Sequence, residues 1–172
     1  DLTRSRGLGD VYKRQLYDCD VVEQQLVMST VPGQPLIELL NDDSIDDATV
    51  NKHLRTAGKS IRMLHRQAIV HGDLSTNNIM ITPEGEAVLI DFGLAKIEFE
   101  TELYGIDLHV LFEILGASHP HREGTMEAVL EGYAQCEEDL GPAPTTSGGD
   151  PVSMSDVLER FDLIRTRVRY HG

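Results

Sequence analysis

The sequence HGDLSTNN (71–78), followed further along by IDFG (90–93), decides the fold of this chain. Between the two motifs, NIMIT (78–82) and AVLI (87–90) are short apolar, β-prone runs. The residues that join them, PEGE (83–86), form a turn sequence. The pattern therefore predicts a β-hairpin that returns the second motif to the neighbourhood of the first.

Three oxygen-bearing side chains belong to these motifs: Asp73, Asn78 and Asp91. Asn78 and Asp91 can hold Mg²⁺, a hard cation that prefers oxygen ligands and substrate phosphates. Asp73 is then left to accept a proton from an attacking hydroxyl or water, or to orient it. Either motif alone occurs by chance, but the ordered pair with strand, turn and strand between them is specific. The arrangement indicates phosphoryl transfer, in which catalysis consists of positioning and charge neutralisation.

Before this centre, the hydropathy pattern predicts short strands in 16–22 and 24–28, a short helix at 35–40 and a long helix over 46–67. Ser44 and Asp47 have the spacing of a capping box at the start of the long helix. One face of this helix is apolar and predicted to be buried: Val50, Leu54, Ala57, Ile61 and Leu64. Its basic residues are predicted to be solvated: Lys52, Arg55, Lys59, Arg62 and Arg66.

After the centre, a helix is predicted to contain Ile106 and to end at Gly116 as its C-cap. A second helix follows around 126–133, then the loop GPAPTTSGGDP (141–151) and a last helix from about Ser153. His65 and two other histidines fall within helical patterns and are predicted to be packing or surface residues: His53 and His109. The pair His119 and His121 lacks a third ligand nearby and is predicted to lie in a surface loop.

Composition limits the classes of function. The chain has 172 residues, 40% of them hydrophobic, and a net charge of -14, which fits one soluble globular domain. Residues 16–158 hold seven basic against 25 acidic groups, so nucleic-acid binding is confined to the basic tail 159–172 or to a partner. With two separated cysteines and no long apolar run, we expect a reducing compartment, no disulfide partner and no membrane.

The segment DLTRSRGLGDVYKRQ (1–15) matches nothing that follows and resembles a translated sequencing adapter, so we expect a non-native origin. GLGDVY (7–12) superficially resembles a glycine-rich phosphate loop but lacks its third glycine.

The motifs HGDLSTNNIM, LIDFGLA, GIDLHVLFEILGASHP and VLERFDLIRTRVRYHG together resemble the C-terminal lobe of a protein-kinase-like fold. The resemblance is closest to the small atypical kinase of the KEOPS complex, the tumour-suppressor-related protein kinase family. It implies an α+β fold, with a mostly helical lobe in which a short β-hairpin bears the catalytic loop. Because residues 7–12 lie too close to 28–31 for the family's strand-borne lysine to fit between, it further implies that 16–172 is this lobe without its N-terminal half, inactive by itself and exposing an apolar face. It also implies ATP and Mg²⁺ as cofactors, Asp73 as the base, and Asn78 and Asp91 as metal ligands.

The resemblance assigns further roles. Met28, Ser29, Thr30 and Val31 match the hinge that binds adenine through its backbone. His71, Gly93 and Asp107 match structural supports of the site, with Asp107 fixing the catalytic-loop backbone and Gly93 supplying backbone freedom after Asp91.

Two departures from ordinary kinases support the narrower family. Gly72 stands where the arginine that clamps a phosphorylated activation loop is usual, and the short stretch from Gly93 to Asp107 leaves no room for such a loop. Ser75 stands where protein kinases carry a lysine near the transferred phosphate, which favours slow ATP hydrolysis over protein phosphorylation.

The implied function is a serine/threonine kinase or ATPase that supports threonylcarbamoyladenosine modification of tRNA, in the cytoplasm, the nucleus or both. The implied partners are the threonylcarbamoyl-transferase subunit and tRNA, the latter through Arg165, Arg167 and Arg169. Two alternatives stay open: a small-molecule kinase of the aminoglycoside or choline type, which also carries an HGD…N loop, and a non-catalytic truncated scaffold.

Overall fold

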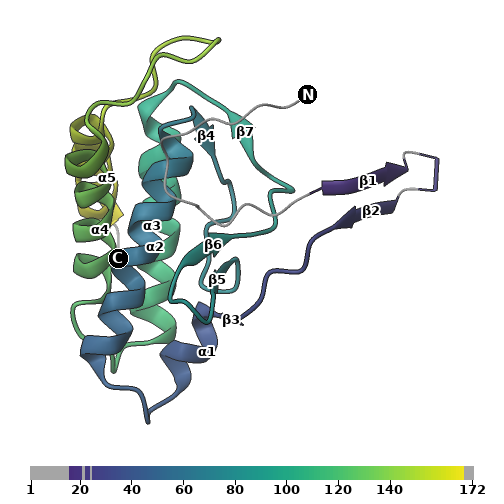
Figure 1. Ribbon diagram of the computed structural model, residues 1–172. Helices are drawn as coiled ribbons and strands as arrows, with labels where there is room; N and C mark the ends of the chain where they lie inside the picture. Colours follow the sequence, from purple (N-terminus) through teal and green to yellow (C-terminus); the bar gives the residue numbers. More distant parts are fainter. Residues whose placement is uncertain (1–15, 21, 24, 169–172) are drawn as a thin grey trace.

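The computed structural model describes residues 16–20, 22–23 and 25–168 (Figure 1). The segment 1–15, the GLGDVY sequence within it, and Arg169 therefore lie outside the described residues. The described chain is α+β, as predicted. Its helices are α1 (Leu36–Asn41), α2 (Asp47–His65), α3 (Thr101–Ser118), α4 (Thr125–Leu140) and α5 (Met154–Val168).

The strands form small antiparallel sheets. An N-terminal hairpin of β1 (Leu16–Asp20) and β2 (Gln25–Met28) extends away from the helices in Figure 1. A second sheet has the order β3–β5–β6, and a third pairs β4 with β7. Their bounds are β3 (Gln34–Pro35), β4 (Ile69–Val70), β5 (Ile79–Ile81), β6 (Ala87–Leu89) and β7 (Lys96–Ile97).

The predicted hairpin between the two motifs is confirmed. Strands β5 and β6 pair antiparallel with Ile79 opposite Leu89 and Ile81 opposite Ala87. The pairing continues one step beyond the strands, because the Ile90 amide donates to the Asn78 carbonyl at 2.9 Å. The end of the first motif and the start of the second are therefore held side by side.

Helix α2 starts differently from the prediction. Its N-cap is Asp46, whose side chain accepts a hydrogen bond from the Thr49 amide at 2.9 Å. Ser44 instead donates to Asp42 within the preceding turn, so the predicted capping box of Ser44 and Asp47 is wrong. The spacing alone could not separate these arrangements, because 41–47 contains several residues that cap well.

The apolar face of α2 is buried as predicted, but two of its basic residues are buried with it. Leu54, Ala57 and Ile61 are 0% exposed. Arg62 is also 0% exposed and Arg66 only 5%, although both were expected in solvent. The reason is that α4 packs along α2 and carries Glu137, which accepts a hydrogen bond from each guanidinium.

Two glycines let the α2 and α4 backbones approach each other. A Cβ on Gly132 would lie 1.9 Å from the Arg55 carbonyl oxygen, and a Cβ on Gly58 would lie 2.0 Å from that of Val129. Any other residue at either position would force the helices apart.

Helix α3 runs past its predicted end. It continues through Gly116 to Ser118, and the His119 amide closes the last turn by donating to the Leu115 carbonyl. Gly116 faces solvent and stays in the right-handed helix, so it is not the predicted C-cap. His119 is also not in a surface position, because it is 1% exposed.

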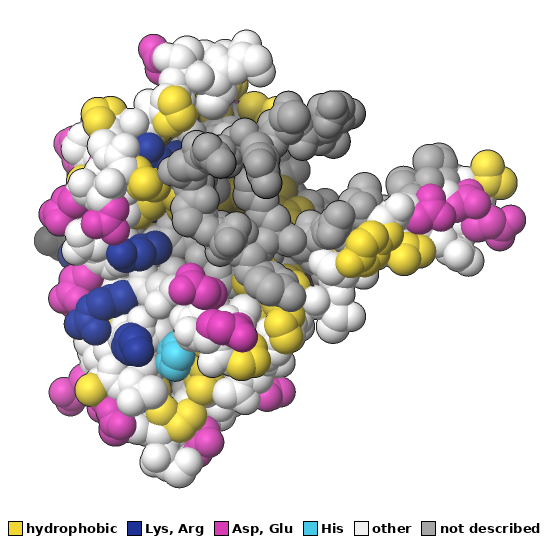
Figure 2. Space-filling view, viewed as in Figure 1, with side chains coloured by type: hydrophobic (Ala, Val, Ile, Leu, Met, Phe, Trp, Pro, Cys, Tyr) yellow, Lys and Arg dark blue, Asp and Glu magenta, His cyan; other side chains and the backbone are white. Residues whose placement is uncertain are grey.

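The core is formed where α2, α3, α4 and α5 pack together and meet strands β4–β6 (Figure 1). On the face in Figure 2, Lys and Arg side chains gather over the helical part, while Asp and Glu side chains are spread over the outline, the centre and the projecting N-terminal hairpin. No described helix is both long enough and apolar enough to cross a membrane.

Candidate active site

A buried aspartate on α3 anchors the backbone of the first motif. Asp107 is 2% exposed, and its Oδ2 accepts the His71 amide at 2.6 Å while its Oδ1 accepts the Gly72 amide at 2.9 Å. Hydrogen bonds from amides to a carboxylate are charge-assisted and stronger than neutral ones. Asp107 therefore fixes the two residues that directly precede Asp73.

Asp73 and Asn78 are joined across the loop. The Asn78 side-chain nitrogen donates to both the backbone oxygen and the Oδ2 of Asp73, at 2.9 and 3.0 Å. The Asn78 amide also donates to the Ser75 carbonyl at 3.0 Å, which closes the turn. This arrangement leaves the Asn78 Oδ1 without a hydrogen bond to another described residue, and Asp73 is exposed to incoming groups.

The His71 ring connects the two motifs. Its Nε2 lies 3.0 Å from the Ile90 carbonyl, which can only accept, so Nε2 carries a proton. Its Nδ1 accepts the Asp73 amide at 3.4 Å, and its ring centroid lies 5.1 Å from that of Phe92. His71 thus sets the distance between the chain before Asp73 and the chain before Asp91.

Asp91 adopts a left-handed backbone conformation, with φ of 61°. Such a φ is uncommon outside glycine, and residues held there concentrate at functional sites. Gly93 does not share this conformation, so the prediction that Gly93 supplies the backbone freedom is wrong. A Cβ on Gly93 would lie 3.3 Å from the Asp91 Oδ1, so the glycine instead makes room for that carboxylate.

The structure gives a physical reason for Gly72. Its φ is 81°, and a Cβ there would lie 2.5 Å from the Leu94 carbonyl oxygen. The backbone after Asp91 therefore runs directly against Gly72. An arginine at this position, as in ordinary kinases, would require both the φ and the path of residues 91–94 to change.

The donor set fits Mg²⁺. Two carboxylates and one amide oxygen are available in Asp73, Asp91 and Asn78, and Mg²⁺ is usually held by one or two carboxylates together with substrate phosphates. No described group of three or more His, Cys, Asp or Glu residues could form a metal cage by itself. These residue types suit a metal ion that is shared with substrate phosphates.

The other predicted site residues lie elsewhere. Met28 ends β2 and Val31 is 8% exposed, while Ser29 and Thr30 connect them. On α5, Arg165 pairs with Asp162 at 2.8 Å and its guanidinium carbon lies 5.7 Å from the Phe161 ring centroid. The nucleotide role of 28–31 and the tail role of Arg165 and Arg167 stay predictions.

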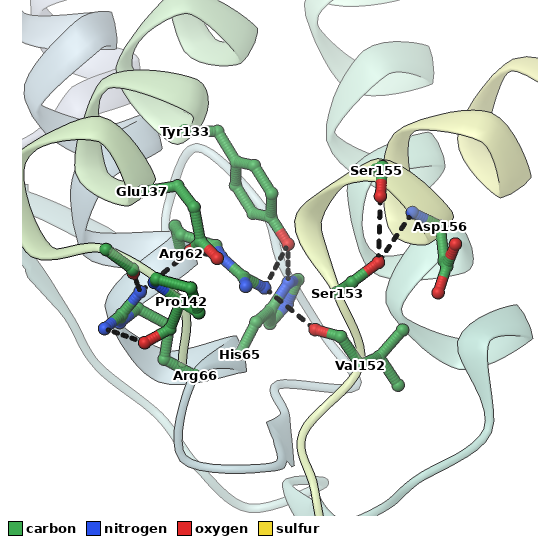
Figure 3. Close-up of polar contacts among 11 residues, drawn as sticks. Arg62, His65, Arg66, Tyr133, Glu137, Pro142, Val152, Ser153, Ser155 and Asp156 are labelled. Atoms are coloured by element: carbon green, nitrogen blue, oxygen red, sulfur yellow. Dashed lines mark hydrogen bonds and ion pairs between the residues drawn. The ribbon is translucent and has the colours of Figure 1, made fainter. Parts of the chain in front are cut away.

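The sequence reasoning missed a buried polar cluster between α2 and α4 (Figure 3), whose His65 contacts Asp107. It consists of Arg62 and His65 from α2 with Tyr133 and Glu137 from α4. One signal was available: His65 lies four residues after Ile61 and so continues the buried face of the helix. The burial of Arg62 had no comparable signal, because it depends on the approach of α4.

Comparison with known proteins identifies a domain family and relatives of this chain. The protein kinase domain model matches residues 14–105. A KEOPS complex subunit Bud32 from Pyrococcus abyssi is 38% identical over 142 residues, covering 81% of this chain and 63% of that protein. A probable bifunctional tRNA threonylcarbamoyladenosine biosynthesis protein from Methanoculleus marisnigri is 39% identical over 114 residues, covering 66% of this chain and 20% of that protein.

An EKC/KEOPS complex subunit bud32 from Aspergillus clavatus is 36% identical over 133 residues, covering 67% of this chain and 43% of that protein. The chain thus spans from a fifth to under two thirds of the length of these curated relatives. The model match includes the loop of Asp73 and Asn78, the hairpin and Asp91. With its fold and these motifs in order, the chain belongs to the protein kinase domain family, and its relatives are KEOPS subunits and tRNA threonylcarbamoyladenosine biosynthesis proteins.

Proposed function

We propose that this chain carries the catalytic loop of an ATP- and Mg²⁺-dependent kinase or ATPase that serves threonylcarbamoyladenosine modification of tRNA as a KEOPS subunit. One observation carries the proposal. The Asp107 carboxylate holds the backbone before Asp73, and the Asn78 amide holds Asp73 itself. Phosphoryl transfer needs this kind of preorganised acceptor beside oxygen ligands for a metal.

The residues divide the work as follows. Asp73 Oδ accepts the proton of the attacking hydroxyl or water, or orients that group, while the bond between the γ-phosphorus and the leaving ADP oxygen breaks. Asn78 and Asp91 hold Mg²⁺, which supplies charge neutralisation at the phosphates. Met28, Ser29, Thr30 and Val31 bind adenine through backbone groups.

The balance of activities favours hydrolysis. Ser75 offers a hydroxyl where a protein kinase offers a lysine to the transferred phosphate, so charge neutralisation there is weaker. We therefore propose slow ATP hydrolysis as the main activity, and we expect the 172-residue chain to be inactive without a lobe that supplies a glycine loop and a lysine.

The names of two relatives, both KEOPS complex subunits, support a proposed assembly. We propose the threonylcarbamoyl-transferase subunit as partner and a contribution of Arg165, Arg167 and Arg169 to contact with that subunit or with tRNA. The cytoplasm, the nucleus or both would be the location. None of the three relatives is an aminoglycoside or choline kinase, which leaves that alternative without support from them.

The test uses the full-length protein with Mg²⁺-ATP. Asp73→Ala should lower ATP turnover about a hundredfold or more, since general acid–base groups contribute at least that much. Asp91→Ala should also weaken the dependence of turnover on Mg²⁺ concentration. Asp43→Ala is the matched control, because that side chain is 91% exposed and has no role in the proposed mechanism. Unchanged turnover in both site variants would overturn the mechanism, and transfer to an aminoglycoside or choline would favour the alternative.

A further inference from the structure

A network of buried polar groups connects α4 with the loop that carries Asp73, and Figure 3 shows its part formed by Arg62, His65 and Tyr133. Arg62, His65 and Tyr133 are each 0% exposed. Arg62 Nη1 lies 3.5 Å from the Tyr133 hydroxyl, and that hydroxyl lies 2.8 Å from His65 Nδ1. His65 Nε2 lies 3.4 Å from Asp107 Oδ2, the same oxygen that accepts the His71 amide. Helix α4 is thereby connected with the loop that carries Asp73.

The two ends and the charge of His65 together determine the direction of every bond in this network. A guanidinium can only donate, so Arg62 donates to the Tyr133 oxygen. An ionised carboxylate can only accept, so His65 Nε2 must carry a proton to bond Asp107. A neutral His65 with its proton on Nε2 has an acceptor at Nδ1, so the Tyr133 hydroxyl then donates to Nδ1.

The surroundings support the neutral imidazole. Burial lowers the pKa of His65, and the opposing attraction of Asp107 does not restore it. Burial likewise raises the pKa of Tyr133, which keeps its hydroxyl protonated and able to donate. Arg62 is itself held by Glu137 at 2.9 Å and by the Val152 carbonyl at 3.3 Å, so the donor end is fixed by α4 and by the chain before α5.

We propose that Tyr133 is a positioning residue for the catalytic loop. Its hydroxyl donates to His65 Nδ1 and thereby keeps the imidazole oriented with its Nε2 proton toward the Asp107 carboxylate, which completes the set of donors around that group. Without the hydroxyl, Nδ1 would be buried without a partner, and the imidazole would turn away from the carboxylate that holds His71 and Gly72. The catalytic part of this inference rests on the proposed function, whereas the hydrogen-bond part does not.

The test compares two substitutions that each remove one buried hydroxyl. Tyr133→Phe breaks the hydrogen-bond network. Tyr104→Phe removes a hydroxyl that is not part of the network and donates to the Glu98 carbonyl. Both rings lie edge-on to His65, with centroids at 5.6 and 4.8 Å, so packing against the imidazole is matched. The full-length protein is used in both cases.

We expect Tyr133→Phe to lower the turnover number about tenfold while the KM for Mg²⁺-ATP changes little, since misplaced catalytic groups affect the transition state. Tyr104→Phe should keep turnover near the wild-type value. Equal turnover in the two variants, with the wild type active, would overturn the positioning role.

Two further measurements do not depend on activity. Nitrogen-15 spectra of labelled histidine should show His65 protonated on Nε2 and hydrogen-bonded at Nδ1 in the wild type and in Tyr104→Phe, with the Nδ1 hydrogen bond lost in Tyr133→Phe. Hydrogen exchange of the His71 and Gly72 amides should be faster only in Tyr133→Phe. Unchanged amide exchange in Tyr133→Phe would overturn the inference, while an inactive wild type with the expected spectra and exchange would overturn the proposed function alone.

Discussion

The buried histidines His65 and His119 differ in whether their ring nitrogens have hydrogen-bond partners. His65 has partners at both ring nitrogens, Tyr133 and Asp107. His119 is equally enclosed, but neither of its nitrogens has a hydrogen-bond partner in the described structure. An unpaired buried polar group costs free energy, whereas a paired one does not. The same residue type therefore stabilises the fold at one position and weakens it at the other.

We predict that His119→Phe increases the free energy of unfolding by about 1 kcal/mol, because it removes two unpaired polar atoms and keeps an aromatic ring. His65→Phe is the matched comparison and should decrease it by about 1–3 kcal/mol, since Tyr133 and Asp107 each lose a partner. Denaturant unfolding at neutral pH measures both. A loss of stability in His119→Phe as large as in His65→Phe would contradict this explanation.

At the scale of the helices, stability depends on how closely α2 and α4 pack. Glycine is normally unfavourable inside a helix by about 1 kcal/mol relative to alanine. At Gly132 this cost is offset, because the Arg55 carbonyl occupies the space that a side chain would need. Gly116, inside α3, has no atom within 4 Å of its would-be Cβ and so carries the cost without this benefit.

Gly132→Ala and Gly116→Ala should therefore act in opposite directions. We predict that Gly132→Ala lowers the free energy of unfolding by about 2 kcal/mol or more, through overpacking against backbone. Gly116→Ala should raise it by about 0.5–1 kcal/mol through helix propensity alone. Unfolding curves of the two variants, taken under the same conditions, give the comparison. Stabilisation by both alanines would show that the helices separate without cost.

At the scale of the whole molecule, buried histidines and paired carboxylates make the fold sensitive to acid. Burial lowers the pKa of His65, His53 and His119 below the ordinary value of 6.5. Burial alone would raise the pKa of Glu137, but the hydrogen bonds and charges of Arg62 and Arg66 hold it below its ordinary value of 4.5. In each case the unfolded chain takes up a proton at a higher pH than the folded chain does.

We predict that stability falls in two stages as the pH is lowered. The histidine contribution is complete above pH 6.5 and decreases below it, and the Glu137 contribution decreases only below pH 4.5. Denaturant midpoints measured across this range follow both stages. His119→Phe should reduce the first stage and Glu137→Gln should remove part of the second. A wild-type midpoint that is constant from pH 7 to pH 5 would contradict the prediction.

The whole molecule also presents apolar side chains close to Asp91. Phe92 is 47% exposed, Leu94 67% and Ile97 72%. An exposed apolar surface of this kind is what we expect of a lobe that meets another part of a kinase-like protein. The role of these residues stays a prediction.

Local signals in the sequence determined most of the elements. The 3.6-residue period predicted α2, and the turn PEGE (83–86) between two β-prone runs predicted the hairpin. These features depend on neighbours along the chain, so the pattern contains them. The order of Asp73, Asn78 and Asp91 around the hairpin was readable for the same reason.

The contacts that hold these elements against one another depend on the tertiary structure. Glu137 reaches Arg62 from 75 residues away, and Asp107 reaches Gly72 from 35 residues away. Contacts between residues so distant in the chain have no local pattern, which is why Arg62 was expected in solvent and Tyr133 was not singled out. The local pattern pointed to the groups for which we propose chemistry, and the packing of α2, α3 and α4 explains what holds them in place.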